Sequence, residues 1–226
     1  MAATLKRRLA KIRRALERRF GRIKRPVKRR RTGLDTLVQT ILSQNTNDAN
    51  SGEAFRRLKR RFPSWRRVLA APKREVERAI RVGGLAAGKA RAIRNTLRWL
   101  ARERGRMSLD FVRALPTDKA MAALTRLGGV GVKTAAVTLC FAYGREVFPV
   151  DTHIRRVSVR LGLAPDKSTA ERVFDMLAPH VPRGAAYGLH LQMIRLGREV
   201  CHARAPECPR CPLARTCPYP GRRGRR

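Results

Sequence analysis

In Leu127-Gly128-Gly129-Val130-Gly131-Val132-Lys133-Thr134-Ala135, one helix is predicted to end, a tight glycine turn to follow and a second helix to begin. Glycines in the turn let the backbone come close to a ligand. The amides and the positive dipole at the start of the second helix suit a phosphate oxygen without reading any base. An ordinary corner between two helices carries the same glycines, so the segment alone leaves both interpretations open.

Helices are predicted on both sides of this turn, because apolar residues recur every three or four positions between short breaks that carry Gly or Pro. The first predicted helix starts after a Thr4 cap and stops at Gly21. No alternating strand pattern and no repeat is visible in the sequence. The expected helices cover residues 5–20, 34–43, 49–61, 64–70, 72–80, 89–104, 108–115, 118–127, 132–143, 152–161, 169–177 and 185–200. An all-α protein follows, with enough length to bury a core.

The chain carries 53 Lys and Arg against 16 Asp and Glu, which gives a formal net charge of +37 over 226 residues. Residues 1–31 hold fifteen of the basic residues and one Glu, and further arginines follow Pro220. Arginine richness can be a compositional habit of a whole genome, yet such a surface still binds phosphate by releasing counterions. A polyanion is therefore the expected partner.

Nucleic acid is favoured over a membrane as that partner, because no apolar run approaches the ~20 residues of a spanning helix. The longest run, from Ala135 to Tyr143, is typical of a buried helix. Arginines interrupt the N-terminus throughout, unlike the apolar core of a secretory signal. We therefore expect an intracellular protein whose clustered cysteines stay reduced.

Four cysteines lie close together near the C-terminus, separated by six, two and five residues: Cys201, Cys208, Cys211 and Cys217. This spacing is typical of a metal site and not of a disulfide framework. Four thiolates suit either a tetrahedral zinc or an iron-sulfur cluster. The fifth cysteine, Cys140, lies in an apolar helix and is expected to be inert packing.

The chain resembles the helix-hairpin-helix DNA glycosylases of the endonuclease III type. The resemblance is carried by the glycine turn 127–135, by Val150-Asp151-Thr152-His153-Ile154 eighteen residues after Lys133, and by the cysteine spacing, in the family's order. It runs from about Leu34 to Cys217. Two departures are mild: Gly128 stands where proline is common, and Val132 where a polar or basic residue is common.

The resemblance implies a fold of two α-helical lobes with DNA across the cleft between them. The first lobe would be a helical barrel, residues 26–145, that contains the hairpin. The second would combine the basic N-terminal helix, residues 1–25, with residues 146–217, which would hold a 4Fe-4S cluster on the four cysteines. A basic tail, 218–226, completes the division. The resemblance favours this cluster over zinc, and we expect it to be structural.

Lys133 is the predicted nucleophile. An amine can capture C1′ of a damaged nucleotide as a Schiff base, after which β-elimination breaks the strand on the 3′ side. A helix start, many positive neighbours and partial burial would each lower the pKa of such a lysine. The resemblance implies that Lys133 is the lyase nucleophile. The plain alternative is a lysine that only binds phosphate or solvent.

Asp151 is the second predicted catalytic residue. It is the only acid between Glu146 and Asp166, and its carboxylate can stabilise a developing oxocarbenium ion or assist deprotonation. It can also cap the helix that begins near Thr152, and both roles are compatible. The resemblance implies the catalytic role. His153 beside it is a weaker candidate for DNA contact.

A glycosylase must extrude its target nucleotide and fill the gap. The loop 43–48 offers Gln44 or Asn45 as the plug, and Leu85 after Gly83-Gly84 matches the family's apolar wedge, although a lone leucine is more often core. Asp48 could line the base pocket or cap the next helix. The remaining expected DNA contacts are Gly129, Val130, Gly131, Lys133, Thr134 and Arg204.

The sequence thus predicts a bifunctional DNA glycosylase and AP lyase of base-excision repair that acts as a monomer on oxidised pyrimidines in duplex DNA. One alternative is a mismatch-type glycosylase of the same fold that does not cut, although such enzymes generally lack an amine at the position of Lys133. A second is a non-catalytic DNA-binding protein stapled by metal, which would not depend on Lys133 or Asp151.

Overall fold

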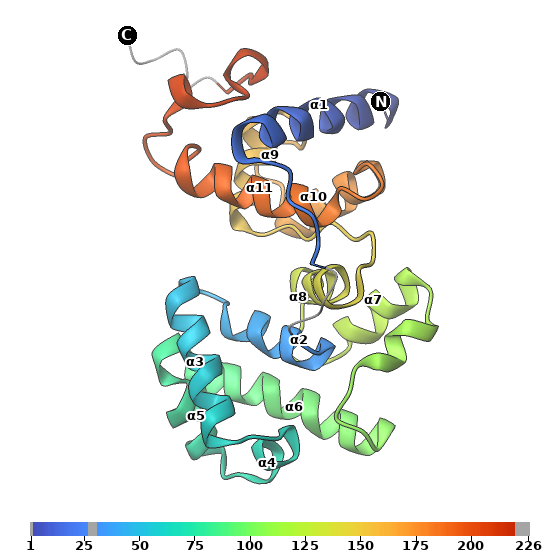
Figure 1. Cartoon of the computed structure of the whole chain (residues 1–226), viewed down its shortest axis with the longest axis vertical. Helices are drawn as coiled ribbons and strands as arrows, with labels where there is room; N and C mark the ends of the chain where they lie inside the picture. The colour runs from blue at the N-terminus through green and yellow to red at the C-terminus, as the bar shows by residue number, and fades with distance from the viewer. Residues whose placement is uncertain (1, 27–30, 220–226) are drawn as a thin grey trace. The chain divides into compact units, whose positions relative to one another are not determined.

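The computed structural model of the chain describes residues 2–26 and 31–219. In these ranges the regular structure is entirely helical, which confirms the all-α prediction (Figure 1). None of the helices in the described ranges has the length and apolar character needed to cross a membrane. Most of the predicted basic tail, from residue 220 on, lies outside the described residues.

The helices agree closely with the predicted segments. They are α1 Ala2–Phe20, α2 Gly33–Leu42, α3 Asp48–Arg61, α4 Trp65–Ala70, α5 Lys73–Ile80, α6 Ala86–Arg104, α7 Thr117–Thr125, α8 Val132–Val137, α9 Thr152–Arg160, α10 Ala170–Leu177 and α11 Ala186–Glu199. Shorter helical turns are η1 Arg81–Gly83, η2 Asp110–Ala114, η3 Thr138–Ala142, η4 Ala178–His180, η5 Cys208–Arg210 and η6 Ala214–Thr216.

Three details differ from the prediction. The helices α1 and α6 each begin three residues before the predicted start, α1 at Ala2 and α6 at Ala86, so Thr4 is not the cap of α1. Residues 110–114 form a 3₁₀ turn instead of an α-helix. The helix expected over 132–143 changes into the π-helical turn η3 after Val137, and Cys140 is buried within that turn.

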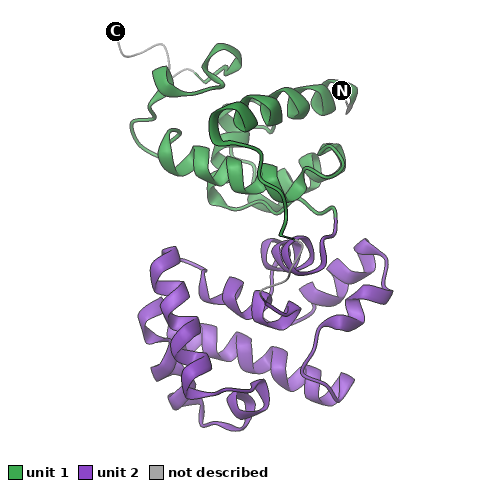
Figure 2. Ribbon diagram, viewed as in Figure 1, with its two compact units in different colours: residues 1–27, 146–226 green, residues 28–145 purple. Residues whose placement is uncertain are grey.

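The chain divides into two compact units (Figure 2). The first combines Met1–Val27 with Glu146–Arg226, and the second is the continuous segment Lys28–Arg145. The first unit is therefore built from the two ends of the chain.

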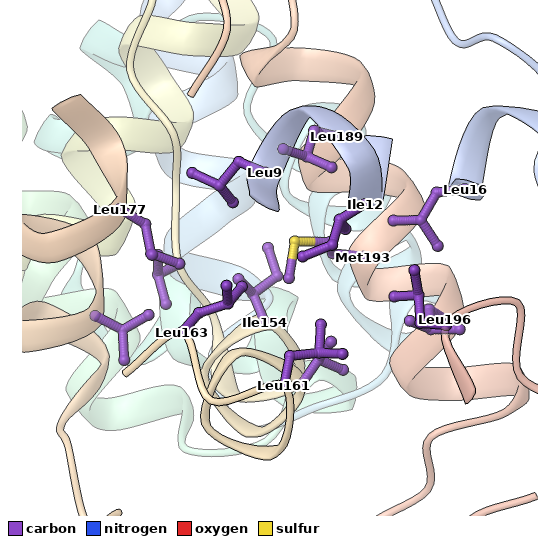
Figure 3. Close-up of a cluster of buried hydrophobic side chains, with 14 of the residues drawn as sticks. Leu9, Ile12, Leu16, Ile154, Leu161, Leu163, Leu177, Leu189, Met193 and Leu196 are labelled. Carbon is purple, nitrogen blue, oxygen red and sulfur yellow. The ribbon is translucent and has the colours of Figure 1, made fainter. Parts of the chain in front are cut away.

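The first unit has one apolar core to which the N-terminal helix contributes. Leu9 and Leu16 of α1 are fully buried, together with Ile154 of α9 and Met193 of α11 (Figure 3). The guanidinium of Arg8 adds a polar tie by donating a 2.9 Å hydrogen bond to the carbonyl of Gly162, just beyond α9. Despite its charge, α1 is thus an amphipathic helix whose apolar stripe closes this core.

The second unit is organised around α2, whose apolar side chains are almost all buried. This helix packs against α3, α6, α8 and η3. Its start is fixed by a capping box, in which Thr32 accepts from the amide of Asp35 and Asp35 accepts from the amide of Thr32, both at 3.1 Å.

Replacing Leu16 with Ala should lower the free energy of unfolding by about 2–5 kcal/mol, because the side chain is fully buried. Lys11→Ala, on the exposed side of the same helix, should change it by less than about 0.5 kcal/mol. Urea denaturation of the full chain measures both. An unchanged stability in Leu16→Ala would contradict the place of α1 in the core.

Candidate functional site

The predicted helix-hairpin-helix is present, and it is formed by α7, the glycine turn and α8. The amide of Val130 donates 2.9 Å to the carbonyl of Leu127 and closes the turn. Gly129 has φ +90°, and a Cβ placed on it would overlap the Cβ of Ala92 on α6. Glycine is required there for two reasons, since another residue would be strained and would push the turn off α6.

Within the hairpin, Gly129 and Gly131 are exposed, whereas the side chains of Val130 and Thr134 are buried. Any contact of Val130 or Thr134 with a ligand would therefore use the main chain. Lys133 lies in the first turn of α8 and is half-buried.

The loop between α2 and α3 lies beside this hairpin. The Gln44 amide donates 3.4 Å to the hydroxyl of Thr134, so Gln44 is directed at α8. Asn45 is exposed and has φ +49°. Asn47 caps α3 by accepting 2.8 Å from the amide of Asn50, so the capping role considered for Asp48 is wrong. Asp48 lies exposed in the first turn of α3.

Leu85 follows η1 and immediately precedes α6. Its side chain is 63% exposed and its φ is +49°. Among the described residues, Leu85 is the only large apolar side chain that is exposed. The alternative that Leu85 is a core residue is therefore wrong.

In the other unit, Asp151 is the N-cap of α9, where its Oδ1 accepts 2.8 Å from the amide of Ile154. The bond fixes the orientation of the carboxylate. The Nδ1 of His153, in the first turn of α9, lies 3.1 Å from the guanidinium of Arg156. Burial lowers the pKa of His153, although the charge of Asp151 acts in the opposite direction. A Cβ on Gly197 would lie 2.9 Å from that of His153, so glycine lets α11 approach α9.

All four clustered cysteines line one small cavity, whose volume is about 30 Å³. Its walls are otherwise mostly apolar and come from α9, α11 and the C-terminal loop: Val157, Leu161, Leu196, Val200, Pro206, Leu213 and Ala214. Burial raises the pKa of the Cys211 thiol, and the charges of Cys201, Cys217 and Cys208 raise it further. Four thiolates gathered this closely repel one another, so the donor set fits a cationic group that would compensate their charge.

Across residues 2–26 and 31–219, no three His, Cys, Asp or Glu side chains are grouped as ligands of one metal ion. The four sulfurs instead lie around the wall of the common cavity. Cys140 is buried in the other unit and takes no part in this arrangement.

Two arginines of α9 support the cysteine loop, a role that the sequence analysis missed. Arg160 donates 3.3 Å to the sulfur of Cys201 and 2.6 Å to the carbonyl of His202. Arg156 donates 3.1 Å to the carbonyl of Cys201. Their spacing of four residues, which puts both on one face of a helix, was the available signal. Arg204 is exposed in the same loop.

The family model described as HhH-GPD superfamily base excision DNA repair protein matches residues 38–182. An Arabidopsis thaliana protein, provisionally named a DNA glycosylase, is 38% identical to this chain over 165 residues. The matched part is 73% of this chain and 56% of that protein. Endonuclease III of Sulfolobus acidocaldarius is 32% identical over 186 residues, 81% of each chain.

A solved structure described as a trapped endonuclease III-DNA covalent intermediate has a TM-score of 0.82 and 29% identity, and covers 97% of this chain and 99% of that one. The two-lobed glycosylase fold is thereby confirmed. The chain belongs to the endonuclease III family within the HhH-GPD superfamily, and it is a DNA glycosylase of base excision repair.

Proposed function

We propose that the protein is a bifunctional DNA glycosylase and AP lyase that removes oxidised pyrimidines from duplex DNA and cuts 3′ to the abasic site. The observation that carries the proposal is the half-buried Lys133 in the first turn after the hairpin, inside the region that matches the family. The covalent complex named for a relative supports the same chemistry.

In this proposal the Nζ of Lys133 attacks C1′ of the damaged nucleotide. As the new N–C1′ bond forms, the bond from C1′ to the base breaks, and the base leaves with the electron pair and takes up a proton. Opening of the sugar ring gives an imine. Loss of a C2′ proton then expels the 3′ phosphate, and water hydrolyses the imine to restore the amine.

Asp151 would stabilise the developing positive charge on the sugar and accept a proton from the amine or from water. The hydrogen bond from Ile154 occupies Oδ1 and holds the side chain in one orientation. The cap would therefore serve catalysis by positioning the carboxylate.

For base extrusion we propose Asn45 as the plug, because it is exposed whereas the Gln44 amide is bonded to Thr134. Leu85, exposed beyond Gly83, would be the wedge. The main chain at Gly129 and Gly131 would bind the phosphate backbone, and Arg204 would add a cation.

Cys201, Cys208, Cys211 and Cys217 would hold a 4Fe-4S cluster in their shared cavity. When bound, this group would tie the C-terminal loop to α9 and α11. We further propose that residues 26–145 form the barrel domain and that residues 1–25 with 146–217 form the cluster domain, because one apolar core joins α1 to α9 and α11.

Replacing Lys133 with Gln should abolish borohydride trapping on duplexes that contain an abasic site or thymine glycol, because the imine requires the amine. Binding to the abasic duplex should remain. Lys119→Gln, which changes an exposed lysine on α7, should keep the adduct. A wild-type protein that binds but traps on neither duplex would favour the mismatch-type enzyme or the non-catalytic binder.

Replacing Asp151 with Asn should slow base removal by about 100-fold or more while leaving the melting temperature nearly unchanged, since an Asn oxygen can still cap α9. Asp151→Ala should also lose about 0.5–2 kcal/mol of stability with the cap. Single-turnover kinetics and thermal melting separate the two effects. A fully active Asn variant would leave Asp151 with the capping role alone.

Protein purified without oxygen should contain iron and acid-labile sulfide in equal amounts and no stoichiometric zinc. Cys211→Ser should lose both and become less stable, because Cys211 lines the cavity, whereas Cys140→Ser should keep both. Elemental and sulfide analysis decides the matter, and stoichiometric zinc without sulfide would replace the cluster with a zinc site.

A further inference from the structure

Lys89, in the first turn of α6, is a charged side chain that is only 3% exposed. Its Nζ donates 2.8 Å hydrogen bonds to two main-chain carbonyls, those of Leu42 and Gly83. Burial lowers the pKa of Lys89. A buried ammonium is costly unless it is well bonded, so these two carbonyls compensate for its lost hydration.

The two carbonyls stand at the start of two different loops. Leu42 ends α2, and residues 43–47 follow it. Gly83 ends η1, and Leu85 lies two residues further on. A Cβ on Gly83 would lie 3.8 Å from the carbonyl oxygen of Leu42 and 3.2 Å from the Cβ of Ala54 on α3. The starts of both loops therefore pack against each other, with one ammonium bonded to both.

Each loop also carries a residue with a positive φ, which asparagine tolerates but which is strained for leucine. Asn45 and Leu85 both have φ +49°, in the left-handed region that favours glycine. Such conformations persist only where the surrounding structure fixes them. The bonds of Lys89 are a restraint that the two loops share.

We propose that Lys89 is a positioning residue that sets the separation of the 43–47 and 83–85 loops, so that Asn45 and Leu85 enter a DNA duplex together. The inference rests on the proposed function, since it requires that the protein extrude a nucleotide. Loops fixed in advance need little ordering on binding, which leaves more of the binding free energy for opening the base pair.

The test compares thymine glycol in a fully paired duplex with thymine glycol in a short bubble of unpaired bases between duplex arms. Lys89→Met keeps the length of the side chain and removes its charge and donors. Its single-turnover rate of base removal should fall at least about tenfold on the paired lesion. The bubble needs no base pair opened, so its rate should change much less.

Lys59→Met is the matched control. Lys59 also donates to a main-chain carbonyl, that of Pro63 at 3.3 Å, but this carbonyl lies between α3 and α4. The ratio of paired to bubble rates should stay at the wild-type value in this variant. In a double-mutant cycle, Lys89→Met should add little to the defect of Leu85→Ala, because the two changes act on one step.

Equal slowing of Lys89→Met on both substrates would overturn the inference and leave Lys89 a structural role. Wild-type protein that is inactive on both substrates would instead remove the proposed function. If Lys89→Met does not fold, Lys89→Arg takes its place, because the larger planar guanidinium keeps the charge but must push the carbonyls apart. A folded Arg variant with the wild-type ratio would also overturn the inference.

Discussion

Three loops of the second unit pack against one face of α6: residues 43–47, residues 83–85 and the glycine turn between α7 and α8. Lys89, Ala92 and Asn95 recur at intervals of three and share that face. Lys89 bonds the starts of two loops, and Ala92 receives the hairpin at Gly129. Asn95 lies beside Gly128 of the same turn, because a Cβ added to Gly128 would lie 3.4 Å from the Nδ2 of Asn95. Because three loops rest on one rigid helix, a shift of α6 would displace all of them at once.

Some of the chain's many arginines hydrogen-bond to the protein's own main chain. Several arginines donate to main-chain carbonyls at the ends of helices, where no amide of the helix can reach. Arg145 bonds the carbonyls of Val112 and Leu115 at the end of η2, and Arg94 bonds that of Ala71 after α4. These guanidiniums keep their charge, but part of their hydrogen-bonding capacity is used within the protein.

The sequence predicted most of the helices and their order, because the apolar periodicity and the breaks between helices are local, and some helices also start at a local cap. Ser64 and Thr169 each bond an amide three residues ahead. That the four cysteines share one loop could also be predicted, because they are close together in the sequence. The role of Lys89 could not, because one of its partners, Leu42, lies 47 residues away and a lysine near a helix start is normally solvated. The positive φ of Leu85 could not be predicted either, because the sequence pattern does not encode it.

The division of the chain has a consequence for its synthesis. Residues 28–145 form one continuous segment, so every contact within their unit is available before residues 146–226 are made. The apolar face of α1 appears earlier but packs against Leu189 and Met193, which are made near the end. At about 5–20 residues per second, α1 waits on the order of ten to thirty seconds for its partners. The core of the first unit can therefore be completed only after α11 has been made.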